Sequence, residues 1–147
     1  MCKAKTYLRK IELADAHINN RLSDLHALRS MATKITATIS PVSVSGSGGQ
    51  DKLGSAVAKI VDLQNEINAE IDRFVDLKRK VGAILDCLED PDHVKVLHKR
   101  YFEYKPWEQI ACEMNYSYRN TCYIHGKALQ AVEALLEGDG DDSDGEG

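Results

Sequence analysis

Residues 53–88 have the sequence LGSAVAKIVDLQNEINAEIDRFVDLKRKVGAILDCL, which contains the most regular apolar pattern of the chain. Along it, a mostly apolar position recurs at alternating steps of four and three residues. The recurring positions are Leu53, Val57, Ile60, Gln64, Ile67, Ile71, Phe74, Lys78, Val81, Leu85 and Leu88. Only Gln64 and Lys78 are polar, so the pattern is a heptad seam over five repeats. It predicts a long helix that packs against another helix.

A second helical pattern lies upstream, over residues 2–38. Its apolar positions recur at steps of three, four or seven residues: Leu8, Ile11, Ile18, Leu22, Leu25, Leu28, Ala32 and Ile35. Residues 39–50 are rich in Ser and Gly and contain Pro41, which predicts a loop. The chain is therefore expected to be all-α, with residues 1–90 forming a long antiparallel coiled-coil hairpin. At ~1.5 Å per residue each arm would be about 55 Å long.

Further apolar residues lie beside the two seams. They are Ile11, Val61, Leu63, Val75, Leu77 and Ile84. A hairpin of two helices cannot bury so wide an apolar stripe. We therefore expect the hairpin to form a homodimer or to dock on another protein.

The composition narrows the classes of function. The net charge of the 147 residues is −4, but residues 137–147 carry six acidic side chains and no basic one, so the rest of the chain is at +2. This acidic tail has no apolar residue and is expected to be disordered. No run of about 18 apolar residues and no apolar signal core is present, so we expect a cytoplasmic protein without a membrane partner. The four cysteines and five histidines have no metal-ligand spacing, and we expect no metal or cofactor.

Residues 91–136 are expected to form a small three-helix domain. Asp92 is a candidate N-cap for a first helix over residues 93–101. Pro106 suits the first position of a second helix that runs to Met114. Asn115 and Tyr116 then form a tight turn, because Asn tolerates the left-handed conformation. Ser117 is expected to cap a third helix that runs to about residue 136.

This arrangement predicts a helix-turn-helix, with Ala111 at the point where its two helices touch. The expected shared core consists of Ile110, Met114, Tyr116, Thr121 and Ile124. The third helix, residues 118–136, would then lie in the major groove of double-stranded DNA. The side chains expected at the groove are Tyr118, Arg119, Asn120, Cys122, Tyr123 and Lys127. Arg119 suits guanine and Asn120 suits adenine, while Lys105, Trp107 and Ser117 are candidate phosphate contacts.

The residues of this domain resemble region 4 of bacterial sigma factors. The resemblance is carried by Leu97-His98-Lys99-Arg100-Tyr101-Phe102, by Trp107-Glu108-Gln109-Ile110-Ala111, by residues 117–125 and by Ala128-Leu129. With its helical N-terminal part, the chain resembles small regulators of phages and prophages, including the ArpU and RinA types of late-gene activator. Four residues depart from the family pattern: Asn115 stands for a turn glycine, Asn120-Thr121 for Thr-Val, and Gly126 lies inside the third helix.

The resemblance implies a sequence-specific transcriptional regulator of phage or prophage genes, acting in the cytoplasm of a bacterial host. Two alternatives stay open. The first is a sigma-like subunit that acts only with RNA polymerase as a partner. The second is a small terminase subunit that recognises DNA for packaging. An enzyme is not expected, because the sequence has no nucleophile–base set, phosphate loop or paired carboxylate site.

Overall fold

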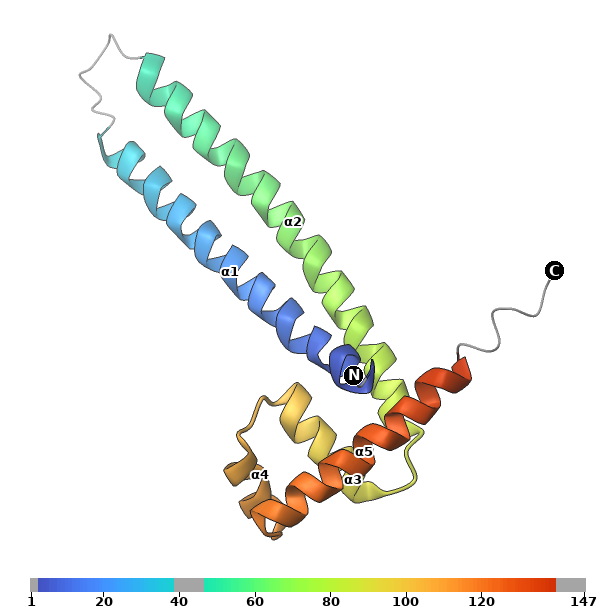
Figure 1. Ribbon diagram of the computed structural model, residues 1–147. Helices are drawn as coiled ribbons and strands as arrows, with labels where there is room; N and C mark the ends of the chain where they lie inside the picture. Colours follow the sequence, from blue (N-terminus) through green and yellow to red (C-terminus); the bar gives the residue numbers. More distant parts are fainter. Residues whose placement is uncertain (1–2, 39–46, 140–147) are drawn as a thin grey trace, which may run out of the picture. The chain divides into compact units, whose positions relative to one another are not determined.

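The computed structural model describes residues 3–38 and 47–139, and all of its regular structure in those ranges is helical. Figure 1 shows the elements along the chain. They are α1 (Lys3–Thr38), α2 (Ser47–Asp86), α3 (Pro91–Leu97), the π-helical turn η1 (His98–Phe102), α4 (Trp107–Met114) and α5 (Tyr118–Asp139). The predicted all-α class is confirmed. No helix in the described ranges is long and apolar enough to cross a membrane.

The chain divides into two compact units. The hairpin unit is Ala14–Phe74, and the terminal unit combines Met1–Leu13 with Val75–Gly147. The first turns of α1 and the last turns of α2 thus belong to the same unit as α3, η1, α4 and α5. The domain limits expected at residues 90 and 136 stay predictions.

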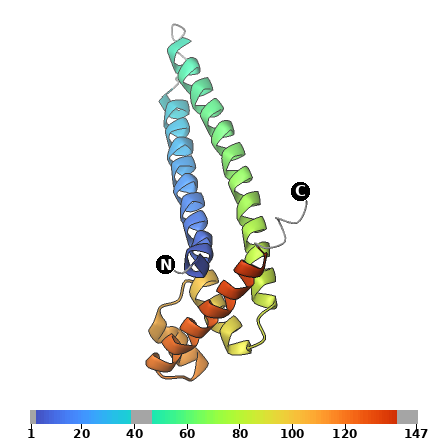
Figure 2. The same cartoon turned by 45° about the vertical axis from the view of Figure 1, so that its right-hand side comes forward.

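In the hairpin unit, α1 and α2 fit a helical hairpin, and Figures 1 and 2 show them running antiparallel. The predicted loop over residues 39–50 was too long at one end, because α2 begins at Ser47; residues 39–46 lie outside the described part of the chain. The second helix was predicted to end at Leu88, but α2 ends at Asp86. The chain then forms a turn through Cys87 and Leu88.

Most of the predicted seam positions are buried or half-buried, but three are exposed. Val57 is 48% exposed, Ile71 is 37% exposed and, on α1, Leu22 is 44% exposed. The positions one residue earlier, Ala56 and Glu70, are buried or half-buried instead. Neighbouring residues differ by about 100° around a helix, so one wide apolar stripe admits either register.

An ion pair explains the register that the hairpin unit adopts. The Arg21 Nε atom donates to Glu70 Oε1 at 2.6 Å, and its Nη1 atom donates to Glu66 Oε2 at 3.1 Å. The Arg21 and Glu70 side chains are half-buried, whereas Leu22 and Ile71 are exposed. Arg21 and Glu70 therefore take the less exposed positions that were predicted for Leu22 and Ile71.

In the terminal unit, α3 begins two residues before the predicted start. Asp90, not Asp92, is the N-cap: its Oδ1 atom accepts a hydrogen bond from the Asp92 N–H at 2.9 Å. Pro91 then occupies the first turn, where a helix needs no N–H donor. Similarly, Pro106 is the N-cap of α4 and not its first residue.

The first predicted helix of this unit also changes its winding. After Leu97 it becomes the π-helical turn η1, closed by the Glu103 N–H donating to the His98 carbonyl at 3.1 Å. The chain leaves this turn through Tyr104, which adopts a φ of 56°. No sequence pattern indicated the π-helical turn.

The core of the terminal unit lies where α5 packs against α3 and α4. Its fully buried side chains include Val96, Leu97, Ile110, Thr121 and Val132. Ala111 is buried, as expected for the contact between α4 and α5. Tyr116, however, was wrongly placed in the core: it is 37% exposed, and its hydroxyl donates to Asp92 Oδ2 at 2.5 Å. Because the Tyr116 hydroxyl forms its hydrogen bond at the surface, the Tyr116 side chain remains partly exposed and does not join the core.

Candidate nucleic-acid interface

The connection between α4 and α5 is a short turn with a fixed geometry. Asn115 adopts the left-handed conformation, with φ 59° and ψ 37°, as the sequence predicted. The Tyr116 N–H donates to the Ala111 carbonyl at 3.0 Å, and the Asn115 N–H donates to the Cys112 carbonyl at 3.2 Å. These two bonds form the Schellman motif that ends many helices. The direction of the chain entering α5 is therefore set by backbone hydrogen bonds.

Ser117 caps α5, as predicted from the sequence. Its Oγ atom accepts a hydrogen bond from the Asn120 N–H at 3.1 Å, and its carbonyl accepts from the Thr121 hydroxyl at 2.9 Å. Thr121 is fully buried. The cap and the buried threonine together fix the first turn of α5 against the core.

One face of α5 is exposed and carries most of the predicted groove residues. Tyr118 is 52% exposed and Tyr123 is 63% exposed. Arg119, Asn120 and Lys127 are exposed as well, whereas Cys122 is half-buried. Within the described ranges Arg119 forms no ion pair, and the Lys127 Nζ atom lies 5.6 Å from the centre of the Tyr123 ring. This face offers two cations, one amide and two aromatic rings to a ligand.

The predicted phosphate contact Lys105 lies in an ion-pair cluster. Its Nζ atom is 2.8 Å from Glu113 Oε1 and 3.0 Å from Glu103 Oε1. The hydrogen bond with Glu113, followed by that with Glu103, raises the pKa of Lys105, and the same bonds lower the pKa values of both carboxyls. Lys99 joins the cluster at 3.5 Å from Glu113. Two lysines thus face two glutamates, which leaves little net charge for a phosphate.

The predicted phosphate contact Trp107 packs on two neighbours. The Arg100 guanidinium lies 4.6 Å from the centre of its ring, and the His125 imidazole meets it edge-on at 4.5 Å. Trp107 is half-buried, so its ring has a structural role in addition to any contact with a ligand.

His125 links α5 to η1 through a side-chain hydrogen bond that the sequence did not indicate. Its Nε2 atom lies 2.8 Å from the Tyr101 hydroxyl. Desolvation by burial, and then the positive charges of Lys5 and Arg100, lower the pKa of His125 to about 4. The imidazole is therefore neutral at pH 7, and it supplies no charge for phosphate binding.

The described residues contain no group of three or more His, Cys, Asp or Glu side chains that could hold a metal ion. Comparison of the chain with protein-family models, with curated proteins and with solved structures gives no match. The function is therefore argued from the chain's own residues.

Proposed function

We propose that the protein is a sequence-specific double-stranded DNA-binding regulator of phage or prophage transcription, and that α5 enters the major groove. The observation that carries this proposal is the exposed face of α5, held by the Asn115 turn and the Ser117 cap. A short helix, a tight turn and a second helix with a polar outer face are the parts of a helix-turn-helix. The resemblance of the same residues to sigma factor region 4 supports the same assignment.

The roles of individual residues follow from exposure and chemistry. Arg119 is exposed on the first turn of α5, and its guanidinium suits bidentate bonds to the O6 and N7 atoms of guanine. Asn120 suits adenine, and the rings of Tyr118 and Tyr123 suit apolar contacts with bases or sugars. Lys127 lies about two turns beyond Arg119 along α5. Its ammonium group suits a phosphate.

The charge of this surface indicates that one copy binds weakly. Lys99 and Lys105 are matched by Glu103 and Glu113, so Arg119 and Lys127 carry most of the free positive charge on the predicted interface. Non-specific affinity depends on the number of phosphates that are neutralised. Tight binding by this surface therefore requires a second copy of the chain or a partner such as RNA polymerase.

The test is selection of binding sites from a random pool of double-stranded DNA by the purified full chain. Affinity for the enriched site is then measured at two salt concentrations for the wild type, Arg119→Ala, Lys127→Ala and Arg29→Ala. Arg29 is exposed on α1 in the hairpin unit and is the matched control for a lost charge.

We expect Arg119→Ala to weaken specific binding by about 1–3 kcal/mol and to relax the preference at one base pair. Lys127→Ala should weaken binding to all sequences alike and reduce the salt dependence, and Arg29→Ala should bind as the wild type does. Enrichment that appears only when RNA polymerase is added would favour the sigma-like alternative. Absence of DNA binding at low salt, with and without polymerase, would refute the proposed function.

A further inference from the structure

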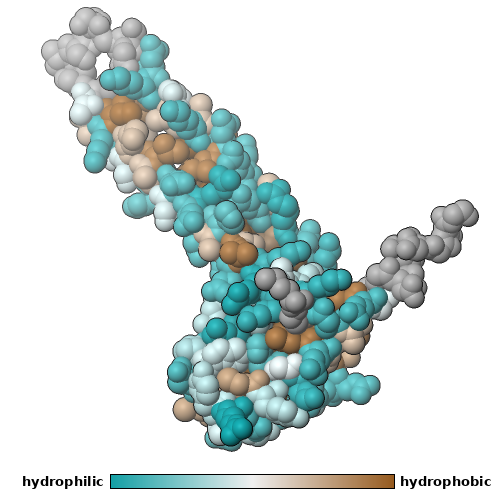
Figure 3. Space-filling model, viewed as in Figure 1, coloured by the Kyte–Doolittle hydropathy of each residue, from teal (hydrophilic) through white to brown (hydrophobic). Residues whose placement is uncertain are grey.

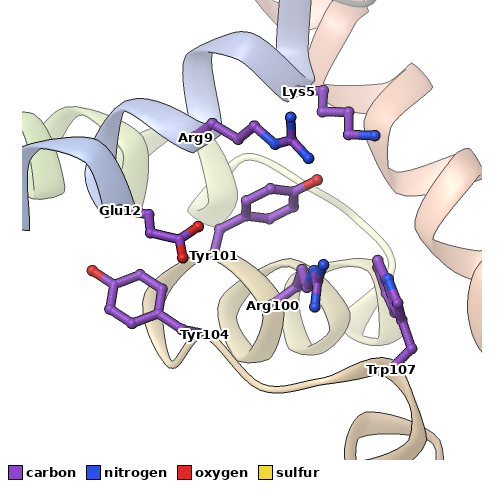
Figure 4. A pocket seen from close by; sticks show the side chains of 7 residues that line it. All are labelled: Lys5, Arg9, Glu12, Arg100, Tyr101, Tyr104 and Trp107. Atoms are coloured by element: carbon purple, nitrogen blue, oxygen red, sulfur yellow. The ribbon is translucent and has the colours of Figure 1, made fainter. Parts of the chain in front are cut away.

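A small polar pocket lies in the terminal unit, between the first turns of α1 and the chain around η1 (Figure 4). Its volume is about 120 Å³. Three cationic side chains, Lys5, Arg9 and Arg100, line it together with one acidic side chain, Glu12. The DNA-binding proposal gives none of these four residues a role.

The pocket carries more positive than negative charge, since three cationic side chains face the single carboxylate of Glu12. Within residues 3–38 and 47–139, neither Lys5 nor Arg9 forms an ion pair. Figure 4 shows the Glu12 carboxylate at the same end of the pocket as Tyr104, while Lys5 and Arg100 lie toward the other end. Lys5 and Arg100 also contribute, after desolvation by burial, to the lowered pKa of His125 in the same unit.

The Arg100 guanidinium is held in place before any ligand arrives. Its Nη1 atom donates to the Lys105 carbonyl at 3.0 Å, and its Cζ atom lies 4.6 Å from the centre of the Trp107 ring. Both contacts restrict the side chain while the other N–H groups of the guanidinium stay available for a ligand. A pre-organised arginine fork suits the oxygen atoms of a carboxylate or a phosphate.

The backbone beside the pocket is unusual at two places. Arg100 and Tyr101 lie in the π-helical turn η1, and Tyr104 has a positive φ of 56°. A bulky residue rarely adopts such a φ. π-Helical turns and backbone outliers of this kind concentrate at functional sites.

We infer that this pocket binds an oxyanion of the phosphate class, with Lys5, Arg9 and Arg100 as its cationic ligands. Three cations against one carboxylate leave an excess of positive charge that suits a doubly charged anion. The volume is below the roughly 300–1,000 Å³ of sites for drug-sized ligands, so the pocket suits a single phosphoryl group. That group belongs either to a free phosphate-bearing molecule or to the backbone of bound DNA.

Trp107 provides the measurement, because it is the single tryptophan of the chain and lines the pocket. Its fluorescence is followed while inorganic phosphate is added to the full chain, with NaCl at matched ionic strength as the control for screening. The proteins are the wild type, Lys5→Gln with Arg9→Gln, Glu12→Gln, and Arg29→Gln as the matched control. Lys5, Arg9 and Glu12 are exposed, so these substitutions leave the core unchanged.

We expect saturable binding of phosphate by the wild type and by Arg29→Gln. The double variant should bind about tenfold more weakly or worse, since charge-assisted hydrogen bonds are lost. Glu12→Gln should bind more tightly, because it removes the one negative side chain of the pocket. Equal affinity in all four proteins, or a fluorescence change that NaCl reproduces, would overturn the inference.

A second experiment, which measures the affinity of the same proteins for double-stranded DNA, identifies the source of the phosphate. If the double variant also binds double-stranded DNA more weakly and free phosphate competes with DNA, the occupant is the DNA backbone. If its DNA affinity equals that of the wild type, the occupant is a free phosphate-bearing molecule. The inference does not rest on DNA binding: a wild type that binds phosphate but no DNA would refute the proposed function and leave the pocket's assignment intact.

Discussion

At the scale of single residues, His125 lies half-buried between Tyr101 and Trp107 and has a pKa of about 4. An imidazole in the unfolded chain has a pKa near 6.5, so the unfolded state binds a proton first as the pH falls. The contribution of the neutral His125 to stability is therefore complete above about pH 6.5. It is lost progressively as the pH falls from 6.5 toward 4.

We predict that this single group lowers the free energy of unfolding by up to about 2 kcal/mol between pH 7 and pH 5. Urea unfolding of the wild type and of His125→Gln at both pH values measures it. The variant should lose less stability on acidification than the wild type does, because Gln carries no proton-binding site. Identical losses in the two proteins would show that His125 is not protonated on unfolding.

The sequence predicted the roles of residues whose hydrogen-bond partners lie close by in the chain. It did not predict the roles of residues whose partners lie far away in the chain. Asn115 and Ser117 were placed correctly because a left-handed turn and an N-cap depend on bonds within five residues. The Tyr116 hydroxyl and the His125 imidazole each meet a partner 24 residues away. No spacing rule for a single helix contains such a contact, so Tyr116 was placed in the core by its aromatic character alone.

At the scale of elements, Gly126 interrupts α5 with the residue type that, after proline, is least favourable in a helix. It is exposed, and a Cβ atom built on it has no neighbour within 4 Å. We predict that Gly126→Ala raises the free energy of unfolding by about 1 kcal/mol. Chemical denaturation measures the gain, and Gly138→Ala, in the last turn of α5, should give a smaller one because helix termini open more easily than helix interiors. An unchanged or lower stability of Gly126→Ala would mean that α5 does not continue as a regular helix through residue 126.

The Arg21–Glu70 pair lies half-buried in the hairpin unit, and among the described residues the buried Glu70 Oε2 atom has no hydrogen-bond partner. We predict that Arg21→Ala destabilises the protein by about 1–2 kcal/mol, since it leaves a half-buried carboxylate unpaired. Replacement of both residues by Leu should restore the stability or exceed that of the wild type. Thermal unfolding of the three proteins tests both statements, and a double-Leu variant as unstable as Arg21→Ala would contradict them.

The hairpin also shows why its helices were predictable while two seam positions of α2, Val57 and Ile71, were not. A heptad of apolar residues predicts a long helix whichever neighbouring residue faces the partner. The choice between Val57 and Ala56, or between Ile71 and Glu70, depends on the facing helix, and there Arg21 selects Glu70. Sequence periodicity within one helix does not contain that choice.

At the scale of the whole molecule, the hairpin unit leaves much apolar surface uncovered, and Figure 3 shows hydrophobic surface along it. Its exposed apolar side chains are Leu22, Met31, Val57, Val61 and Ile71. A hollow of about 400 Å³ between its helices is lined by Leu28, Met31, Ile35 and Ala56, with polar side chains around them. A second copy of the hairpin would cover both features.

We predict that the full chain is at least dimeric at micromolar concentration. Size-exclusion chromatography with light scattering measures its mass. Val57→Lys with Ile71→Lys should produce a monomer, because two charges then lie in the apolar stripe. Ala58→Lys with Ala69→Lys adds the same charge at exposed positions outside the stripe and should leave the mass unchanged. A wild type that is strictly monomeric would contradict the prediction.

¹H–¹⁵N NMR of the full chain can show whether the outer face of α5 contacts DNA. Titration with the DNA site enriched from the random pool should shift the amide signals of residues 117–127 first and most, together with the Arg119 side-chain signal. The hairpin signals of residues 14–38 should stay in place. Shifts confined to the hairpin unit, or no shift at saturating DNA, would show that the outer face of α5 does not contact DNA.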